Sequence, residues 1–190
     1  MKKLLSLILA LMLVVCAVPA MAELSLGAPF NMAVADFQTW FNTFAGVEVN
    51  WVEGDGFVTG SAEGFSDVTL VLDASGKVSY VAVSVTGSMT DTSFANALGQ
   101  SAANVAMSAL MGETSDMNAL QQYAATFEAD FTQVCSCMVN ATNYTLDQMV
   151  EGVSSSGTMM GYPACMSYRV NATNMTMEVI FMLCPKGTTF

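Results

Sequence analysis

Residues 68–85 read VTLVLDASGKVSYVAVSV, and this stretch decides the fold class of the chain. Two runs rich in β-branched residues flank a polar turn that contains Ser75-Gly76, which is the pattern of a β-hairpin. Because side chains alternate along a strand, one face of this hairpin is aliphatic and the other is mixed, so we expect a half-buried antiparallel sheet. A turn centred on Ser75-Gly76 predicts three cross-strand pairs: Leu72 with Ser79, Leu70 with Val81, and Val68 with Val83.

The segment before this hairpin contains a helix and two further strands. Apolar residues at steps of three and four predict an N-terminal amphipathic helix that Gly46 ends. Alternation over residues 47–51 and a turn at Asp55-Gly56 predict the two strands. The apolar stripe of the helix consists of Phe30, Val34, Phe37, Phe41 and Phe44.

Two helical stretches follow the hairpin. Residues 94–111 are rich in alanine and uncharged, so we expect a helix that is buried on more than one side. Residues 117–134 carry apolar side chains at helical spacing, and the short polar loop between the two stretches predicts an αα-hairpin.

The C-terminal third contains a local repeat. Asn-Ala-Thr-Asn occurs at residues 140–143 and again at 171–174. Each copy suits a hairpin turn, because asparagine bonds its own backbone and tolerates left-handed dihedral angles. The second copy predicts a hairpin in which Val170 pairs with Met175 and Arg169 lies diagonal to Glu178.

The first copy leads into a different pattern. Residues 145–148 form a capping box, which favours a short helix over 146–153, and residues 154–157 then read as a flexible connection. The elements together predict an α+β fold, in which an antiparallel sheet packs against the N-terminal amphipathic helix and the helical hairpin.

The first 22 residues match a secretory signal peptide. Lys2 and Lys3 precede an apolar run over residues 4–18, and Ala20-Met21-Ala22 is a small-x-small cleavage site. The run is shorter than the ~20 residues that a membrane-spanning helix needs, which disfavours an uncleaved anchor. We therefore expect cleavage after Ala22 and a single secreted domain over 23–190, located outside the cell or in the cell envelope.

Composition excludes several classes of function. The chain has no histidine, so Ser-His-Asp and Cys-His catalysis and His-ligated metal sites are excluded. Its 16 acidic and 5 basic residues give a net charge of −11, and loss of Lys2 and Lys3 leaves 3 basic against 16 acidic residues, or −13. Such a surface repels phosphate backbones and anionic lipids, so we expect neither nucleic acid nor, after cleavage, a membrane as partner.

Four cysteines follow the signal peptide. An even number in a secreted chain favours disulfides. A bond between Cys135 and Cys137 would close a strained ring, so we favour two bridges from this segment to the last two strands, which carry Cys165 and Cys184. Free thiols and a copper or zinc site built from the four cysteines are the alternatives, because methionine sulfur lies nearby. The methionines in question are Met138, Met166 and Met182.

Carboxylate pairs are the remaining route to acid–base catalysis. Glu53 and Asp55 flank a glycine, and Glu63 and Asp67 bracket a second loop. Such a pair serves glycoside hydrolysis when one carboxyl has a raised pKa, but acids spaced by glycine favour a solvated loop. The chain has no Gly-x-Ser-x-Gly elbow, no Ser-x-x-Lys and no glycine-rich phosphate loop, so neither a catalytic residue nor a cofactor is predicted.

Four asparagines begin Asn-x-Thr sequons. In a eukaryotic secreted protein they suggest glycosylation, and in a bacterial protein they are turn residues. The short signal peptide with its Lys-Lys start favours a bacterial source. The asparagines are Asn140, Asn143, Asn171 and Asn174.

Residues 1–85 resemble small, uncharacterised secreted or lipoprotein-type proteins of anaerobic Gram-positive bacteria. The resemblance rests on the Lys-Lys signal, an aromatic helix that opens with Pro29-Phe30-Asn31-Met32, and the Asp-Ala-Ser-Gly-Lys hairpin. It implies an α+β fold and a compartment, and supplies no catalytic residue. We expect a non-enzymatic secreted module that binds a protein, peptide or glycan. The alternatives are a soft-metal protein that uses cysteine and methionine, and an acid-pair hydrolase around Glu53 and Asp55.

Overall fold

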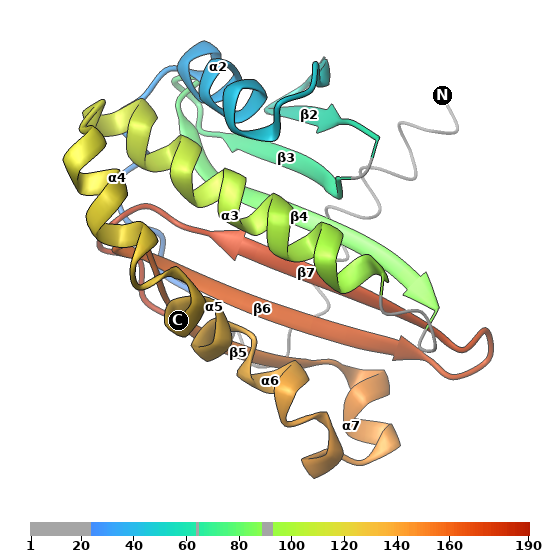
Figure 1. The fold of residues 1–190 in the computed structure, drawn as a ribbon. Helices are drawn as coiled ribbons and strands as arrows, with labels where there is room; N and C mark the ends of the chain where they lie inside the picture. The colour runs from blue at the N-terminus through green and yellow to red at the C-terminus, as the bar shows by residue number, and fades with distance from the viewer. Residues whose placement is uncertain (1–23, 64, 89–92) are drawn as a thin grey trace.

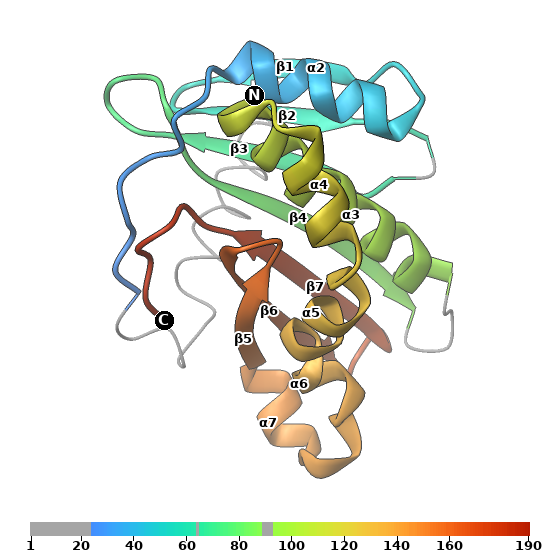
Figure 2. The same cartoon turned by 60° about the vertical axis from the view of Figure 1, so that its left-hand side comes forward.

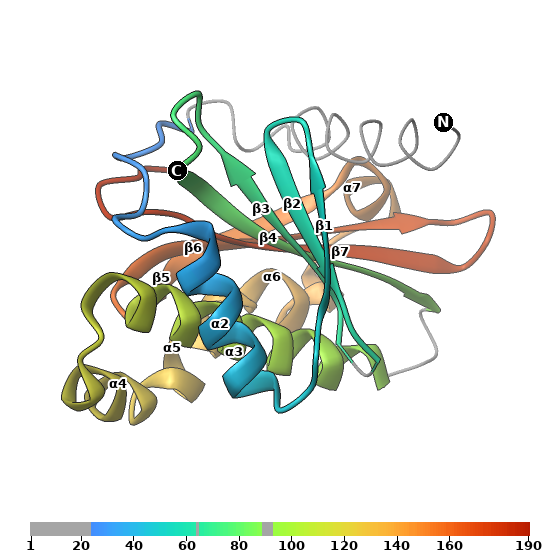
Figure 3. The same ribbon diagram turned by 90° about the horizontal axis from the view of Figure 1, so that it is seen from above.

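The computed structural model describes residues 24–63, 65–88 and 93–190, without the side chains of 93–95. The predicted signal peptide therefore lies outside the described residues. Within them, seven strands form one antiparallel sheet in the order β1-β2-β3-β4-β7-β6-β5. Helices α2, α3, α4 and α5 lie on one face of this sheet (Figure 1, Figure 3). The predicted α+β class is confirmed. Among the helices of the described residues, none combines the length and the apolar character of a membrane-spanning segment.

The first four strands form a meander. The predicted turn at Asp55-Gly56 is confirmed: it joins β1 to β2, and Gly56 has a φ of 77°, in the region that favours glycine. The strands are β1 Asn50–Gly54, β2 Phe57–Ser61, β3 Asp67–Leu72 and β4 Val78–Ser88.

The register of the β3–β4 hairpin follows from its alternating pattern. Two of the three predicted pairs are confirmed: Val68 with Val83, and Leu70 with Val81. The third is wrong, because the register shifts between Val71 and Leu72, and Leu72 lies opposite Val78 instead of Ser79. The shift is of the β-bulge type, which adds one residue to one strand next to the turn.

The N-terminal amphipathic helix is confirmed as α2, Val34–Ala45. Gly46 ends it with a φ of 67°, a left-handed conformation in which glycine carries no Cβ penalty. Phe37 and Phe41 are buried, and both rings meet the edge or face of Trp51 at centroid distances of 6.4 and 5.8 Å. These aromatic contacts fix α2 over β1 and β2.

Phe30 belongs to the predicted stripe of this helix but lies before it. Its backbone N–H donates to the carbonyl of Val78 at 2.9 Å, so the segment that enters α2 is tied to the start of β4. The Phe30 side chain is fully buried and packs against Tyr162, with ring centroids 5.6 Å apart.

The predicted helical hairpin has one break more than the sequence pattern indicates. Helix α3, Ser93–Thr114, is confirmed, but the stretch 117–134 divides into α4, Met117–Ala124, and α5, Phe127–Val134. At the break the Thr126 N–H donates to the Tyr123 carbonyl at 3.1 Å. The break turns α5 onto the edge of the sheet, where it packs against β5 (Figure 2).

The C-terminal third contains one strand that the sequence pattern does not predict. The capping box at Thr145 is confirmed and starts a short helix. The predicted flexible connection at 154–157 is wrong, since these residues lie within a seven-residue strand. The elements are α6 Ser136–Val139, the 3₁₀ turn η2 Ala141–Asn143, α7 Leu146–Glu151, β5 Val153–Met159, β6 Tyr162–Asn171 and β7 Thr176–Leu183.

The β6–β7 hairpin has the predicted faces and a different register. Val170 lies opposite Met177 instead of Met175, and Arg169 lies directly opposite Glu178 instead of diagonal to it. A shift of two residues leaves every side chain on its predicted face.

The two copies of Asn-Ala-Thr-Asn adopt different structures. Asn171 accepts hydrogen bonds from the N–H groups of Thr173 and Asn174 at 3.1 and 3.2 Å, and forms the predicted turn. In the first copy Asn140 donates its side-chain amide to the carbonyl of Ser136 at 2.9 Å. This copy joins two helices, so the hairpin turn suggested there is wrong.

Candidate functional site

The sheet divides the cysteines into two pairs. Cys135 and Cys137 belong to the core under the helices, whereas Cys165 and Cys184 belong to a smaller apolar cluster on the opposite face, which we call the outer face. All four are buried free thiols. A bridge between the pairs would have to pass through the sheet, which argues against the pairing that the sequence favours.

Burial sets the ionisation of the helix-side thiols. Removal from water raises the pKa of Cys135 to about 12, and the neighbouring Cys137 adds to the effect. The Cys137 pKa is also raised by burial, although the Ser155 hydroxyl opposes the shift. Both groups are therefore neutral thiols at physiological pH, which makes them poor nucleophiles.

We expect the raised pKa of the Cys135 thiol to lower the stability of the folded chain at alkaline pH. Its pKa in the folded chain lies above the ordinary 9.0, so the folded chain holds this proton more tightly than the unfolded chain does. The contribution to stability is present below pH 9 and is lost as the pH rises from there toward about 12. In reduced protein, urea unfolding between pH 8 and about pH 10 should show a shallower decline for Cys135→Ala than for wild type. The same decline of the unfolding free energy with pH in Cys135→Ala and in wild type would contradict a raised pKa at Cys135.

The predicted acid pair does not form an enclosed site. Glu53 lies in β1 and Asp55 in the turn after it, and both side chains are exposed. Glu63 and Asp67 are also exposed. A catalytic general acid needs a carboxyl in an apolar pocket, and the exposed positions of these four side chains do not provide one.

Strand β5 forms one border of the sheet. It pairs with β6 alone, and among the described residues no strand pairs with its other side (Figure 2). Its sequence, VSSSGTM, contains no charged residue and no proline. Natural edge strands usually carry such residues to block pairing with other chains, so β5 is an unprotected edge.

Hydrogen bonds hold β5 rigidly against the helices. The Ser155 hydroxyl donates to the carbonyl of Val134 at 2.6 Å and accepts from the N–H of Cys137 at 3.0 Å. A Cβ on Gly157 would lie 3.2 Å from the side chains of Gln133 and Val134. The absence of a side chain at Gly157 thus lets α5 approach β5 closely. The Ser155 hydroxyl provides hydrogen-bond partners for the backbone groups of Val134 and Cys137, at the break between α5 and α6.

The backbone groups that β5 presents outward can be assigned from the neighbouring ladder. The Cys184 N–H donates to the carbonyl of Pro163 at 2.8 Å, so the odd-numbered residues of β6 bond to β7 and the even-numbered residues bond to β5. The β5 residues that pair with these even-numbered positions have odd numbers, and their N–H and C=O groups bond to β6. The N–H and C=O groups that point away from the sheet therefore belong to Ser154, Ser156 and Thr158.

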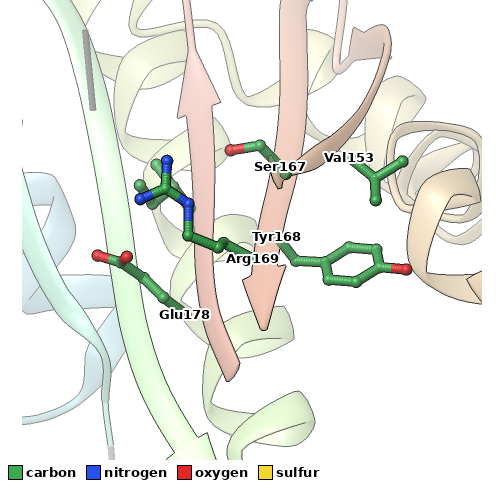
Figure 4. Close-up of a pocket in the computed structure, with 7 residues that line it drawn as sticks. Val153, Ser167, Tyr168, Arg169 and Glu178 are labelled. Atoms are coloured by element: carbon green, nitrogen blue, oxygen red, sulfur yellow. The ribbon is translucent and has the colours of Figure 1, made fainter. Parts of the chain in front are cut away.

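A shallow pocket lies beside the start of β5. Its volume is about 320 Å³ including its open mouth. Arg169 and Glu178 extend into it side by side from adjacent strands, while Tyr168 points away from them (Figure 4). The side chains that line the pocket include one cation, one anion and two hydroxyl groups. Its lining consists of Gly152, Val153, Ser167, Tyr168, Arg169, Glu178 and Ile180.

The sequons all lie at the surface. Asn140, Asn143, Asn171 and Asn174 are exposed, in the η2 region and at the β6–β7 turn.

Sequence reasoning missed β5 as a candidate binding element because its Ser-Ser-Ser-Gly centre is typical of turns and loops. Val153 and Met159 are apolar residues an even number of positions apart, at the two ends of an uncharged stretch, and they are the one sequence signal for a strand here.

No protein-family model, curated protein or solved structure matches this chain.

Proposed function

We propose that this chain is a secreted, non-enzymatic binding module that holds an extended, positively charged segment of another protein along β5. The observation that carries the proposal is the rigid, uncharged edge strand with outward backbone groups at Ser154, Ser156 and Thr158. Extended peptides add to such edges through main-chain hydrogen bonds, and pockets beside the edge select side chains.

The charge of the partner follows from the two ends of β5. Glu151 and Asp147, both exposed, lie just before the strand. Asp130 lies at its other end, where its carboxylate accepts a hydrogen bond from the N–H of Met160 at 3.2 Å. A bound segment about seven residues long would therefore meet acidic groups at both of its ends, which favours lysine or arginine there.

The edge geometry favours a peptide over the other ligands that the sequence left open. A row of backbone N–H and C=O groups at strand spacing is complementary to another extended backbone. Sugar rings are usually recognised by aromatic faces, and the pocket beside β5 has one tyrosine, which points away from Arg169 and Glu178 (Figure 4).

Proline at position 156 tests the proposal. Ser156→Pro removes one outward N–H and places a ring at the edge, whereas the ladder to β6 is unaffected because the Ser156 N–H points away from it. We expect binding to weaken by at least about tenfold, the effect of losing one main-chain hydrogen bond and adding a steric block. The probe is a labelled peptide of alternating Thr and Val residues with lysine at both ends, measured by fluorescence polarisation.

The matched control is Ser156→Ala, which changes the same side chain and keeps the N–H. It should bind the lysine-flanked peptide as wild type does, and a glutamate-flanked peptide should bind neither protein. Equal loss in Ser156→Ala and Ser156→Pro, or full binding by Ser156→Pro, would contradict strand addition at β5. Circular dichroism of both variants checks that the sheet is intact.

A further inference from the structure

Three sulfur atoms gather on the outer face of the sheet. Cys165 in β6 lies directly opposite Met182 in β7, and Cys184 follows β7 with its N–H bonded to the Pro163 carbonyl. Residues two apart on a strand share a face, so the three side chains point the same way. They belong to one apolar cluster and are at most 5% exposed. The cluster therefore concentrates two thiols and one thioether in a dry environment.

The positions of the two thiols suit a bridging metal better than a disulfide. Cys165 and Cys184 are diagonal neighbours across β6 and β7, and diagonal partners in an antiparallel pair lie roughly 7–8 Å apart, with somewhat less between their Cβ atoms. A disulfide needs Cβ atoms about 3.5–4.5 Å apart. A metal ion that binds both thiols lies about 2.3 Å from each sulfur, so the two sulfur atoms can lie roughly twice as far apart as in a disulfide.

We propose that Cys165, Cys184 and Met182 form a binding site for a single Cu(I) ion. Thiolate and thioether are the soft ligands that select Cu(I), and Cu(I) is stable with two or three ligands. Zinc in a structural site takes four ligands, and in the described residues no group of three or more cysteine or acidic side chains is placed to hold a metal. Met182 supplies the third donor without adding charge.

Binding is a substitution without electron transfer. The thiols of Cys165 and Cys184 each release one proton to solvent, two Cu–S bonds form, and the Met182 sulfur donates a lone pair to the same ion. The copper enters and remains as Cu(I). The apolar neighbours Leu24 and Tyr80 exclude water from the site, which disfavours the harder Cu(II) ion.

The site lies on the opposite face of the sheet from the other sulfur pair, and Cys165 lies directly opposite Ser156 of β5. Cys135 and Cys137 lie under the helices on the opposite face. They have the same residue type, similar burial and raised pKa values, so Cys135 is a matched control position.

A chelator competition measures the proposed affinity. The purified chain, reduced and kept anaerobic, is titrated with Cu(I) against the coloured chelator bathocuproine disulfonate. We expect one tightly held Cu(I) per chain, lost in Cys165→Ser and in Cys184→Ser. Met182→Leu should weaken binding by at least about tenfold, since loss of even an outer-shell partner has that effect. Cys135→Ser should bind as wild type does.

Two further measurements make the outcomes decisive. Copper X-ray absorption should show a shell of sulfur neighbours alone, in which Met182→Leu loses one. Mass spectrometry of unreduced protein should find Cys165 and Cys184 open to alkylation after unfolding. Retention of copper by both serine variants, a requirement for Cys135, or a disulfide between Cys165 and Cys184 would each overturn the proposal. Circular dichroism before titration excludes variants that fail to fold.

Discussion

Truncation of Phe181 to alanine is expected to lower the free energy of unfolding by about 4 kcal/mol, the usual cost of removing a buried phenylalanine ring. Phe181 is fully buried at the centre of the sheet, opposite Val83 on one neighbouring strand and Met166 on the other. Its ring faces the helices, so its loss leaves a cavity between the sheet and α3 that rigid backbone on both sides cannot fill. Urea denaturation followed by circular dichroism measures the change.

The same substitution at the chain end is the control. Phe190 is 38% exposed, so Phe190→Ala should cost less than about 1 kcal/mol. A similar loss at both positions would mean that the β4–β7 pair is not the centre of the core.

Replacement of Glu113 by alanine is expected to cost about 3 kcal/mol, because it removes the acceptor of two hydrogen bonds. The Glu113 carboxylate accepts from the hydroxyl of Tyr162 at 2.7 Å and from the backbone N–H of Asn31 at 2.9 Å. These bonds join α3 to β6 and to the segment that precedes α2. The Tyr162 side chain is fully buried, so the substitution removes the side-chain acceptor of a buried hydroxyl.

The cost is expected to depend on which partner is removed. Tyr162→Phe removes the buried hydroxyl itself and should be less destabilising than Glu113→Ala. In the double variant the two effects should fall short of their sum by about 1 kcal/mol or more, the sign of a direct interaction. Additive effects in urea unfolding would show that the 2.7 Å contact contributes nothing. Burial and the Glu113 charge raise the pKa of Tyr162, so the hydroxyl remains a donor through the neutral range.

Local patterns predicted the buried faces of two hairpins correctly, and their register only in part. The hairpin over residues 68–85 needed only period-two alternation and a turn, and two of its three expected pairs are present. The shift at Val71 and Leu72 could not be foreseen, because a bulge leaves the apolar pattern of the strands nearly unchanged. The β6–β7 pairing contains no bulge, but a displacement by two residues keeps every side chain on its face, so the faces were predicted correctly and the register was not.

Strand β5 shows the limit of local patterns. Its central residues, Ser154 to Gly157, favour turns and loops when taken alone. They extend because β6 offers a ladder, because Ser155 bonds to Val134 and Cys137, and because Gly157 admits α5. Only β6 adjoins β5 in the sequence, whereas Val134, Cys137 and α5 lie earlier in the chain. The candidate peptide-binding edge could therefore not be predicted from the sequence alone.

The sequence by itself determined the antiparallel α+β class, the buried faces of its helices and strands, and the number of cysteines, because periodicity and composition are local properties. Only the tertiary structure decided that β5 is an open edge, that Glu113 joins three segments, and that the sheet separates Cys135 and Cys137 from Cys165 and Cys184. The physical reason is common to all three. Each depends on which distant segments pair or pack, and that choice is made by the free energy of the whole core.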